Sequence, residues 1–122
     1  MILVDTSVWI DHFRKSIPAL AQALEGDRVL IHPFVIGELA CGSLQRRREV
    51  LDLLATLPSS VVATHEETLH FIEHHHLMSK GIGYIDVHLL ASAVLTNAGQ
   101  LWTHDKRLAE LAMHLLVGFE IG

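Results

Sequence analysis

The chain has 122 residues and a formal net charge of −5, and half of its residues are hydrophobic. This length suits one domain spanning residues 1–122, and the apolar content argues against a chain that is disordered throughout. The acidic balance argues against a protein that grips nucleic acid through a broad basic face, because Lys and Arg normally supply the affinity for phosphates. It leaves open an acidic site that binds divalent cations.

The sequence predicts neither a secretory signal nor a membrane segment. Asp5 interrupts the first apolar run before that run reaches signal-peptide length. The longest uncharged stretch, residues 87–104, contains His, Ser, Thr, Asn, Gly and Gln, so it is a poor membrane span. A single cysteine, Cys41, excludes an internal disulfide and fits a reducing cytoplasm. We expect Cys41 to be a small buried hydrophobe.

The first part of the chain alternates short apolar runs with helical patterns. Residues 2–4 predict a strand buried on both faces, and Thr6 or Ser7 is expected to cap the helix that follows. That helix is expected to bury four apolar side chains: Val8, Trp9, Ile10 and Phe13. Residues 19–24 predict a short helix ending near Gly26, and residues 29–31 predict a second strand closed by Pro33.

Helical patterns then dominate the rest of the chain. They cover residues 34–42, 50–57, 65–79, 84–97 and 108–115. In the helix at residues 84–97, four side chains are expected to pack inward: Leu89, Leu90, Ala93 and Val94. Residues 101–103 predict a strand, and residues 61–62 and 116–119 predict shorter ones. Strands separated by helices imply a parallel sheet covered on both faces. We therefore predict an α/β domain with a mostly parallel central sheet of four to five short strands flanked by helices.

Four acidic residues interrupt apolar surroundings. Asp5 and Asp105 follow predicted strands, at the edge where open α/β sheets collect their ligands. Asp86 opens the helix at residues 84–97, and Glu38 lies inside the apolar segment VIGELA. Taken singly, each aspartate is equally well explained as a helix cap, and Glu38 as a solvent-facing side chain. Because all four are expected at one end of one sheet, we interpret them as a cluster.

Clustered carboxylates without compensating Lys or Arg repel one another and raise one another's pKa. Hard divalent cations such as Mg²⁺ and Mn²⁺ remove this repulsion, since they prefer carboxylate and water oxygens. A metal site of this kind polarises a phosphate and lowers the pKa of a water molecule. The residues alone therefore predict metal-dependent phosphoryl chemistry.

Four segments resemble the acidic motifs of PIN-domain ribonucleases: DTSVWIDHF, VIGELACG, YIDVHLLASA and LWTHDKRL. The opening MILVDTSVWI is similar especially to VapC-type toxins of bacterial type II toxin–antitoxin systems. The resemblance spans the chain from Asp5 to Asp105 and implies a PIN-like α/β fold.

The resemblance implies one acidic site that is both catalytic and metal-binding: Asp5, Glu38, Asp86 and Asp105. It gives possible supporting roles to three hydroxyl residues: Thr6, Ser7 and Thr103. It further implies Mg²⁺- or Mn²⁺-dependent endonucleolytic cleavage of structured RNA, commonly tRNA or rRNA. The expected partners are a second copy of the chain and a cognate VapB-like antitoxin, whose C-terminal segment enters the active-site groove. His104 has no role that the resemblance explains.

Two conspicuous runs are not assigned to this site. His74-His75-His76 invites a metal interpretation, but consecutive residues on a regular helix point about 100° apart, so we expect a solvated face. Arg46-Arg47-Arg48 is expected to be a solvated helix start, with RNA contact or partner docking as alternatives. Three other cations are equally good phosphate candidates because they lie near the acidic residues in sequence: Lys80, Lys106 and Arg107.

Other functions stay open at the level of sequence. A haloacid-dehalogenase-like phosphatase would use Asp5 as its nucleophile, but it usually has an aspartate two residues later, where this chain has Ser7. A non-catalytic module with the same fold would bind RNA or a partner without cleavage. A DNA-directed nuclease of related architecture is a smaller possibility, because a short chain has little room to grip branched DNA.

Overall fold

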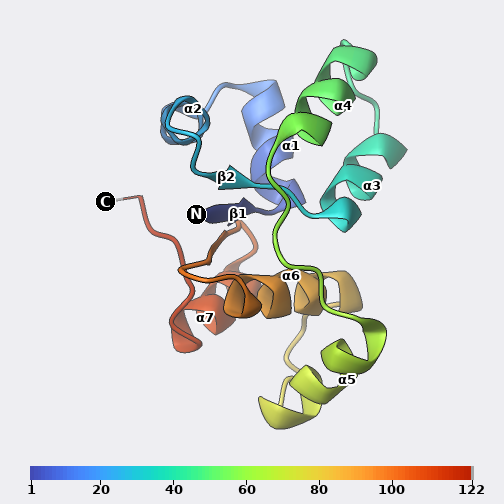
Figure 1. The fold of residues 1–122 in the computed structure, drawn as a ribbon, viewed down its shortest axis with the longest axis vertical. Coiled ribbons are helices and arrows are strands. Elements are labelled where there is room, and N and C mark those ends of the chain that lie inside the picture. Colours follow the sequence, from blue (N-terminus) through green and yellow to red (C-terminus); the bar gives the residue numbers. More distant parts are fainter. Residues whose placement is uncertain (122) are drawn as a thin grey trace.

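A parallel sheet lies between two groups of helices in the computed structural model, which describes residues 1–121. The strands β1 (Ile2–Val4), β2 (Val29–Leu30) and β3 (Gln100–Trp102) are arranged in the order β2-β1-β3. The helices α1 to α4 lie on one side of these strands and α5 to α7 on the other (Figure 1). The prediction of a parallel sheet flanked by helices is confirmed.

The sheet has three strands where we predicted four to five. Single parallel bridges extend it at both edges, between Ile31 and Ser59 beyond β2, and between Leu101 and Gly118 beyond β3. The predicted strand at residues 61–62 is wrong, because the chain leaves the sheet after Ser60 donates its N–H to the Ile31 carbonyl. Each edge bridge joins a single pair of residues, which is too short to count as a strand. The bridge at Gly118 lies within the strand predicted at residues 116–119.

Seven helices cover the sheet within the described residues. Their bounds are α1 (Thr6–Arg14), α2 (Pro18–Glu25), α3 (Pro33–Cys41), α4 (Arg47–Thr56), α5 (His65–His74), α6 (Tyr84–Leu95) and α7 (Lys106–His114). Proline occupies the first turn of α2 and α3, where its missing N–H breaks no helical hydrogen bond. None of these helices has the length and apolar character that a membrane crossing requires.

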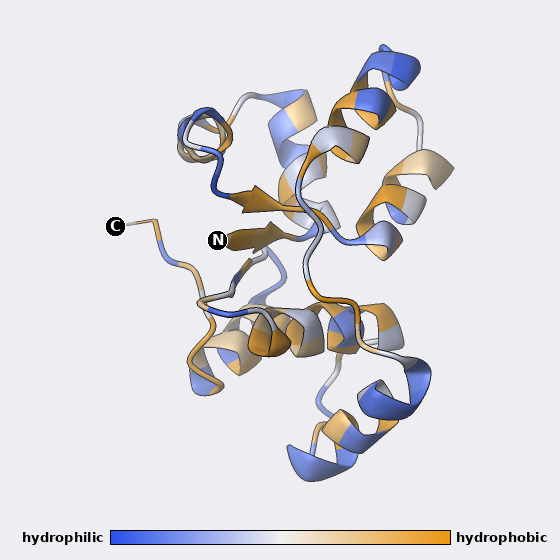
Figure 2. Ribbon diagram, viewed as in Figure 1, coloured by the Kyte–Doolittle hydropathy of each residue, from blue (hydrophilic) through white to orange (hydrophobic). Residues whose placement is uncertain are grey.

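The core forms around β1 and α6. Leu3 and Val4 are fully buried, because β1 is paired on both edges and covered on both faces. Helix α6 packs against β1, β3, α5 and α7 and buries seven consecutive residues from Val87 to Ala93. Figure 2 shows β1, β2 and parts of α6 in the hydrophobic colour, whereas α5 is largely hydrophilic and α4 has bands of both colours. Trp9 and Trp102 are buried as predicted.

Several local predictions are wrong. Asp5, rather than Thr6 or Ser7, is the N-cap of α1, since its carboxylate accepts the Thr6 N–H. Helix α5 ends at His74 instead of residue 79, because His76 and Ser79 adopt left-handed backbone conformations that a helix does not allow.

Burial also differs from the prediction at four positions. The side chains expected inside but found on the surface are Ile10, Phe13, Cys41 and Val94. Each of these residues lies in a helix that we predicted, so the helices themselves are correct. The prediction was wrong about which face of each helix another element covers. Ile10 and Phe13 are 41% and 39% exposed and border a groove described below.

His32 is a buried polar residue that links the fold to pH. It is fully buried at the start of α3, where its Nδ1 accepts the Phe34 N–H at 3.0 Å. Within the described residues, its Nε2 has no hydrogen-bond partner. Burial and, to a smaller degree, the charge of the neighbouring His88 lower the pKa of His32 to about 4. The folded protein therefore holds a neutral His32 that must take up a proton when the chain unfolds in acid.

We expect His32 to make the protein less stable in mild acid. Its folded pKa lies below the ordinary value of 6.5, so its contribution is complete above pH 6.5 and is lost as pH falls toward 4. The loss approaches about 3 kcal/mol. Urea unfolding between neutral pH and pH 4 should show a shallower pH dependence for His32→Asn, which keeps a capping acceptor but cannot titrate. Parallel pH profiles for the two proteins would contradict the assignment.

Candidate active site

The four predicted acidic residues come together at the carboxyl edge of the sheet. Asp5 directly follows β1, and Asp105 lies three residues beyond the end of β3. Asp86 is in the first turn of α6, and Glu38 is in the second turn of α3. Their proximity is electrostatic as well as topological, because the charges of Asp5, Asp105 and Glu38 all act on Asp86.

Asp5 is the most buried of the four, with 6% of its surface exposed. Its Oδ1 accepts the Thr6 N–H at 2.8 Å, which caps α1. Its Oδ2 accepts the hydroxyls of Ser7 at 2.8 Å and of Thr103 at 2.7 Å. These donors replace the water that a buried carboxylate loses, so the charge is tolerated at the end of an apolar strand.

The three predicted hydroxyl residues all contact carboxylates or their neighbours. Thr6 donates its hydroxyl to Oε1 of Glu38 at 2.8 Å, which joins α1 to α3. Thr103 also accepts the backbone N–H of Asp105 at 3.0 Å, so one hydroxyl orients two aspartates. The hydroxyls therefore bond two of the four carboxylates, those of Asp5 and Glu38, and hold the backbone of a third acidic residue, Asp105.

Asp86 and Asp105 are each held by a helix terminus. Oδ2 of Asp86 accepts the Gly83 N–H at 3.2 Å, and Oδ1 of Asp105 accepts the Leu108 N–H at 2.9 Å at the start of α7. Burial raises the pKa of Asp86 above its ordinary value, the bond from Gly83 opposes this, and the other carboxylates raise the pKa further. The site therefore disfavours adding another negative charge and favours a cation.

The donor set fits a hard divalent cation. Within residues 1–121, one oxygen of three carboxylates accepts no hydrogen bond from the protein: Oε2 of Glu38, Oδ1 of Asp86 and Oδ2 of Asp105. No three His, Cys, Asp or Glu side chains in this part of the chain already stand in an arrangement that holds a metal ion. The oxygen ligands that these residues offer are nevertheless of the kind that Mg²⁺ and Mn²⁺ prefer.

Two further residues contribute to the site that the sequence did not indicate. His104 donates its backbone N–H to Oγ of Ser7 at 3.0 Å, and its ring contacts the carboxylate of Asp11. These bonds fasten the turn after β3 to α1. Asp11 looks like an ordinary polar position on an amphipathic helix, so no local pattern could have identified this pairing.

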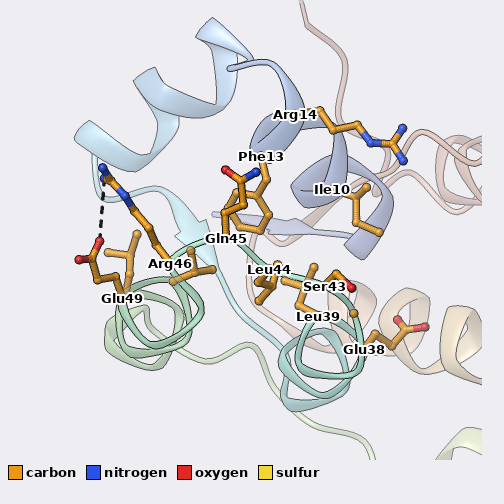
Figure 3. A pocket seen from close by; sticks show the side chains of 13 residues that line it. Ile10, Phe13, Arg14, Glu38, Leu39, Ser43, Leu44, Gln45, Arg46 and Glu49 are labelled. Atoms are coloured by element: carbon orange, nitrogen blue, oxygen red, sulfur yellow. Dashed lines mark ion pairs between the residues drawn. The ribbon is translucent and has the colours of Figure 1, made fainter.

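A groove of about 780 Å³ adjoins the acidic site at Glu38. It lies between α1, the loop after α3, and α4, and its apolar lining includes Ile10, Phe13 and Leu53. Figure 3 shows Glu38 at one end of this groove and the ion pair of Arg46 with Glu49 at the other. The groove is therefore continuous with the acidic site and has cations along its border.

Within residues 1–121, the histidine and arginine runs form no hydrogen bond or ion pair with the four acidic residues, although Arg46 lines the same groove as Glu38. His74 ends α5, and its ring stacks on that of His70 at 6.0 Å between centroids. Arg46 precedes α4, and all three arginines of the run are exposed, as expected for a solvated helix start.

The sequence comparisons agree with this geometry. A profile of the PIN domain family matches residues 2–113, which is most of the chain. The chain belongs to the PIN domain family, as its four acidic motifs predicted. It is similar to Ribonuclease VapC32 of Mycobacterium tuberculosis strains CDC 1551/Oshkosh and ATCC 25618/H37Rv, with 48% identity over 108 residues to each. The match covers 88% of this chain and 87% of each relative, which confirms the resemblance to the VapC-type branch.

Capping and charge can be separated at Asp5. Asn keeps an oxygen that accepts the Thr6 N–H, so Asp5→Asn should change the free energy of unfolding by less than about 1 kcal/mol. Asp5→Ala removes the cap and the acceptor for two hydroxyls, and it should lose about 1–3 kcal/mol. Urea unfolding measures both. Equal losses in the two variants would mean that the negative charge itself holds the fold.

Proposed function

We propose that this chain is a metal-dependent endoribonuclease toxin that cleaves structured RNA, such as tRNA or rRNA. The observation that carries the proposal is the meeting of four carboxylates from four separate segments at one sheet edge. Such a site suits a divalent cation and a phosphodiester substrate. The name of the M. tuberculosis relative, a ribonuclease, supports RNA as the substrate.

Asp5, Glu38, Asp86 and Asp105 would hold Mg²⁺ or Mn²⁺ directly or through water. When bound, the metal supplies charge stabilisation for the phosphate and lowers the pKa of a water molecule. The protein's own contribution is orientation: Thr6 positions Glu38, and Thr103 positions two aspartates. Hydrogen bonds of this kind limit the conformations that these side chains must lose when a cation binds.

The phosphatase alternative is disfavoured by the surroundings of Asp5. Both of its oxygens already accept hydrogen bonds: Oδ1 accepts one from the protein and Oδ2 accepts two. A nucleophilic carboxylate would need a free oxygen directed at the phosphate. Asp5 is therefore better suited to balancing the charge of a bound cation than to attacking a phosphate as a nucleophile. A complete acidic set also argues against a non-catalytic module.

Glu38 offers the cleanest test, because it is exposed and its replacement by Gln keeps an acceptor for Thr6. We expect Glu38→Gln to lower RNA cleavage in Mg²⁺ or Mn²⁺ by about a hundredfold or more, and to weaken Mn²⁺ binding measured by calorimetry. EDTA should abolish cleavage by the unaltered chain.

The matched control for this test is Glu25→Gln, which removes an equal charge at the end of α2 and should behave like the unaltered chain. Full cleavage by Glu38→Gln, or cleavage that persists in EDTA, would refute the metal-dependent mechanism.

We further propose that a cognate VapB-like antitoxin docks in the groove between α1, α3 and α4. The support is its open apolar lining at Ile10, Phe13 and Leu53, next to Arg14 and the acidic site. An amphipathic segment would bury these side chains and block RNA at Glu38. The homodimer implied by the resemblance and the cytoplasmic location indicated by the single cysteine stay predictions. Exposed apolar side chains at Leu69 and Leu95 support self-association.

Phe13→Asp tests the groove. A charge at this apolar surface should weaken antitoxin binding by at least about tenfold and leave RNA cleavage unchanged, because Phe13 is not among the acidic residues. Leu116→Asp is the control, since Leu116 is 92% exposed outside the groove. Binding measured by calorimetry that is equal for both variants would place the antitoxin elsewhere.

A further inference from the structure

A second cavity, of about 480 Å³, lies on the other side of the acidic site from the groove, between the turn that follows α5 and helix α7. Leu77, Leu111 and Leu115 supply its apolar lining. Its polar lining is unusual for a chain with a net negative charge. Five side chains that carry nitrogen line it, together with a single carboxylate, that of Glu110. The five are Lys80, Arg107, His75, His76 and His114.

The cations of this cavity are not neutralised by the protein. Within residues 1–121, neither Lys80 nor Arg107 forms an ion pair, although Glu110 lines the same cavity. The chain has only nine Lys and Arg residues against fourteen Asp and Glu. Two unpaired cations in one concave surface therefore create a local positive potential that the overall charge conceals.

The turn at Gly81 lies directly against one of these cations. Gly81 has a φ of +79°, which L side chains rarely adopt, and the Arg107 side chain lies directly against it. A Cβ at this position would collide with the guanidinium group. Because Lys80 precedes Gly81, the turn brings Lys80 and Arg107 to the same cavity before any ligand binds.

Both walls of the cavity lead into the acidic site. On α7, Arg107 lies two residues after Asp105. On the opposite wall, Gly81 lies two residues before Gly83, whose N–H is bonded to Asp86. An RNA strand bound at the carboxylates could therefore extend into the cavity without passing over another helix or strand.

We propose that this cavity binds a backbone phosphate of the RNA substrate, next to the phosphate that is cleaved, with Lys80 and Arg107 as its direct contacts. The inference rests on the proposed function. RNA is favoured over an acidic protein because the cavity adjoins the carboxylate site along two elements, whereas the apolar groove for a protein partner lies on the side of α1 and α4. The three histidines add ring N–H donors around the phosphate.

The test compares two variants that remove equal charge. Lys80→Gln/Arg107→Gln empties the cavity of its cations, and Lys15→Gln/Arg28→Gln removes two exposed cations at the opposite edge of the sheet, at the end of α1 and before β2. Binding of a fluorescein-labelled tRNA in EDTA is followed by anisotropy over a KCl series. We expect the cavity variant to bind about tenfold more weakly, with a salt slope shallower by about one to two, and the control to bind as the unaltered chain does.

Two further measurements distinguish contact from structural damage. Glu110→Gln removes the one acid in the cavity and should tighten RNA binding about two- to fivefold. In cleavage assays with Mg²⁺, the cavity variant should raise KM about tenfold and leave kcat unchanged. Thermal melting checks that each variant folds.

Equal RNA binding and KM for the cavity variant and its control would overturn the inference while leaving the proposed nuclease intact. Loss of antitoxin binding with RNA binding unchanged would overturn it too, and would assign the cavity to the protein partner. If the unaltered chain neither binds nor cleaves RNA, the proposed function fails and the inference fails with it.

Discussion

The hydrogen bonds of the Asp5 carboxylate are the interaction on which the candidate site depends. Asp5 ends the central strand, and its own N–H donates to the Trp102 carbonyl, so its backbone is fixed by the sheet. One carboxylate oxygen caps the N-terminus of α1, and the other accepts the hydroxyl of Thr103, 98 residues away in the sequence. A buried charge is costly without such donors. The same bonds that make Asp5 tolerable therefore join β1, α1 and the turn after β3 into one rigid edge.

This edge separates charges of opposite sign. Burial raises the pKa of Asp86, and the charges of the other three acidic residues raise it further. Lys80 and Arg107 lie in a neighbouring cavity instead of neutralising them. Under the proposed function, this separation would leave carboxylate oxygens for a cation and unpaired Lys and Arg side chains for the RNA phosphates.

Helix α1 shows how one element serves two surfaces. Val8 and Trp9 pack into the core, while Ile10 and Phe13 face the groove that begins at Glu38. The groove therefore shares a helix with the acidic site, and Thr6 at the start of that helix contacts Glu38. A partner seated on the outer face of α1 would lie directly beside the carboxylates. Under the proposed function, partner binding would therefore block RNA through position alone, without any change of shape.

The sequence by itself determined the order of helices and strands, the parallel sheet and the set of four acidic residues to consider. These follow from local signals: apolar periodicity, Pro and Gly at element ends, and acids placed directly after apolar runs. Only the tertiary structure decided which hydroxyl meets which carboxylate, that His104 contacts Asp11, and that Cys41 and Phe13 face solvent. Periodicity identifies an apolar face, but whether another element covers that face depends on segments far away in the chain. The cavity of Lys80 and Arg107 is of the same kind, since it exists only where the turn at Gly81 meets α7.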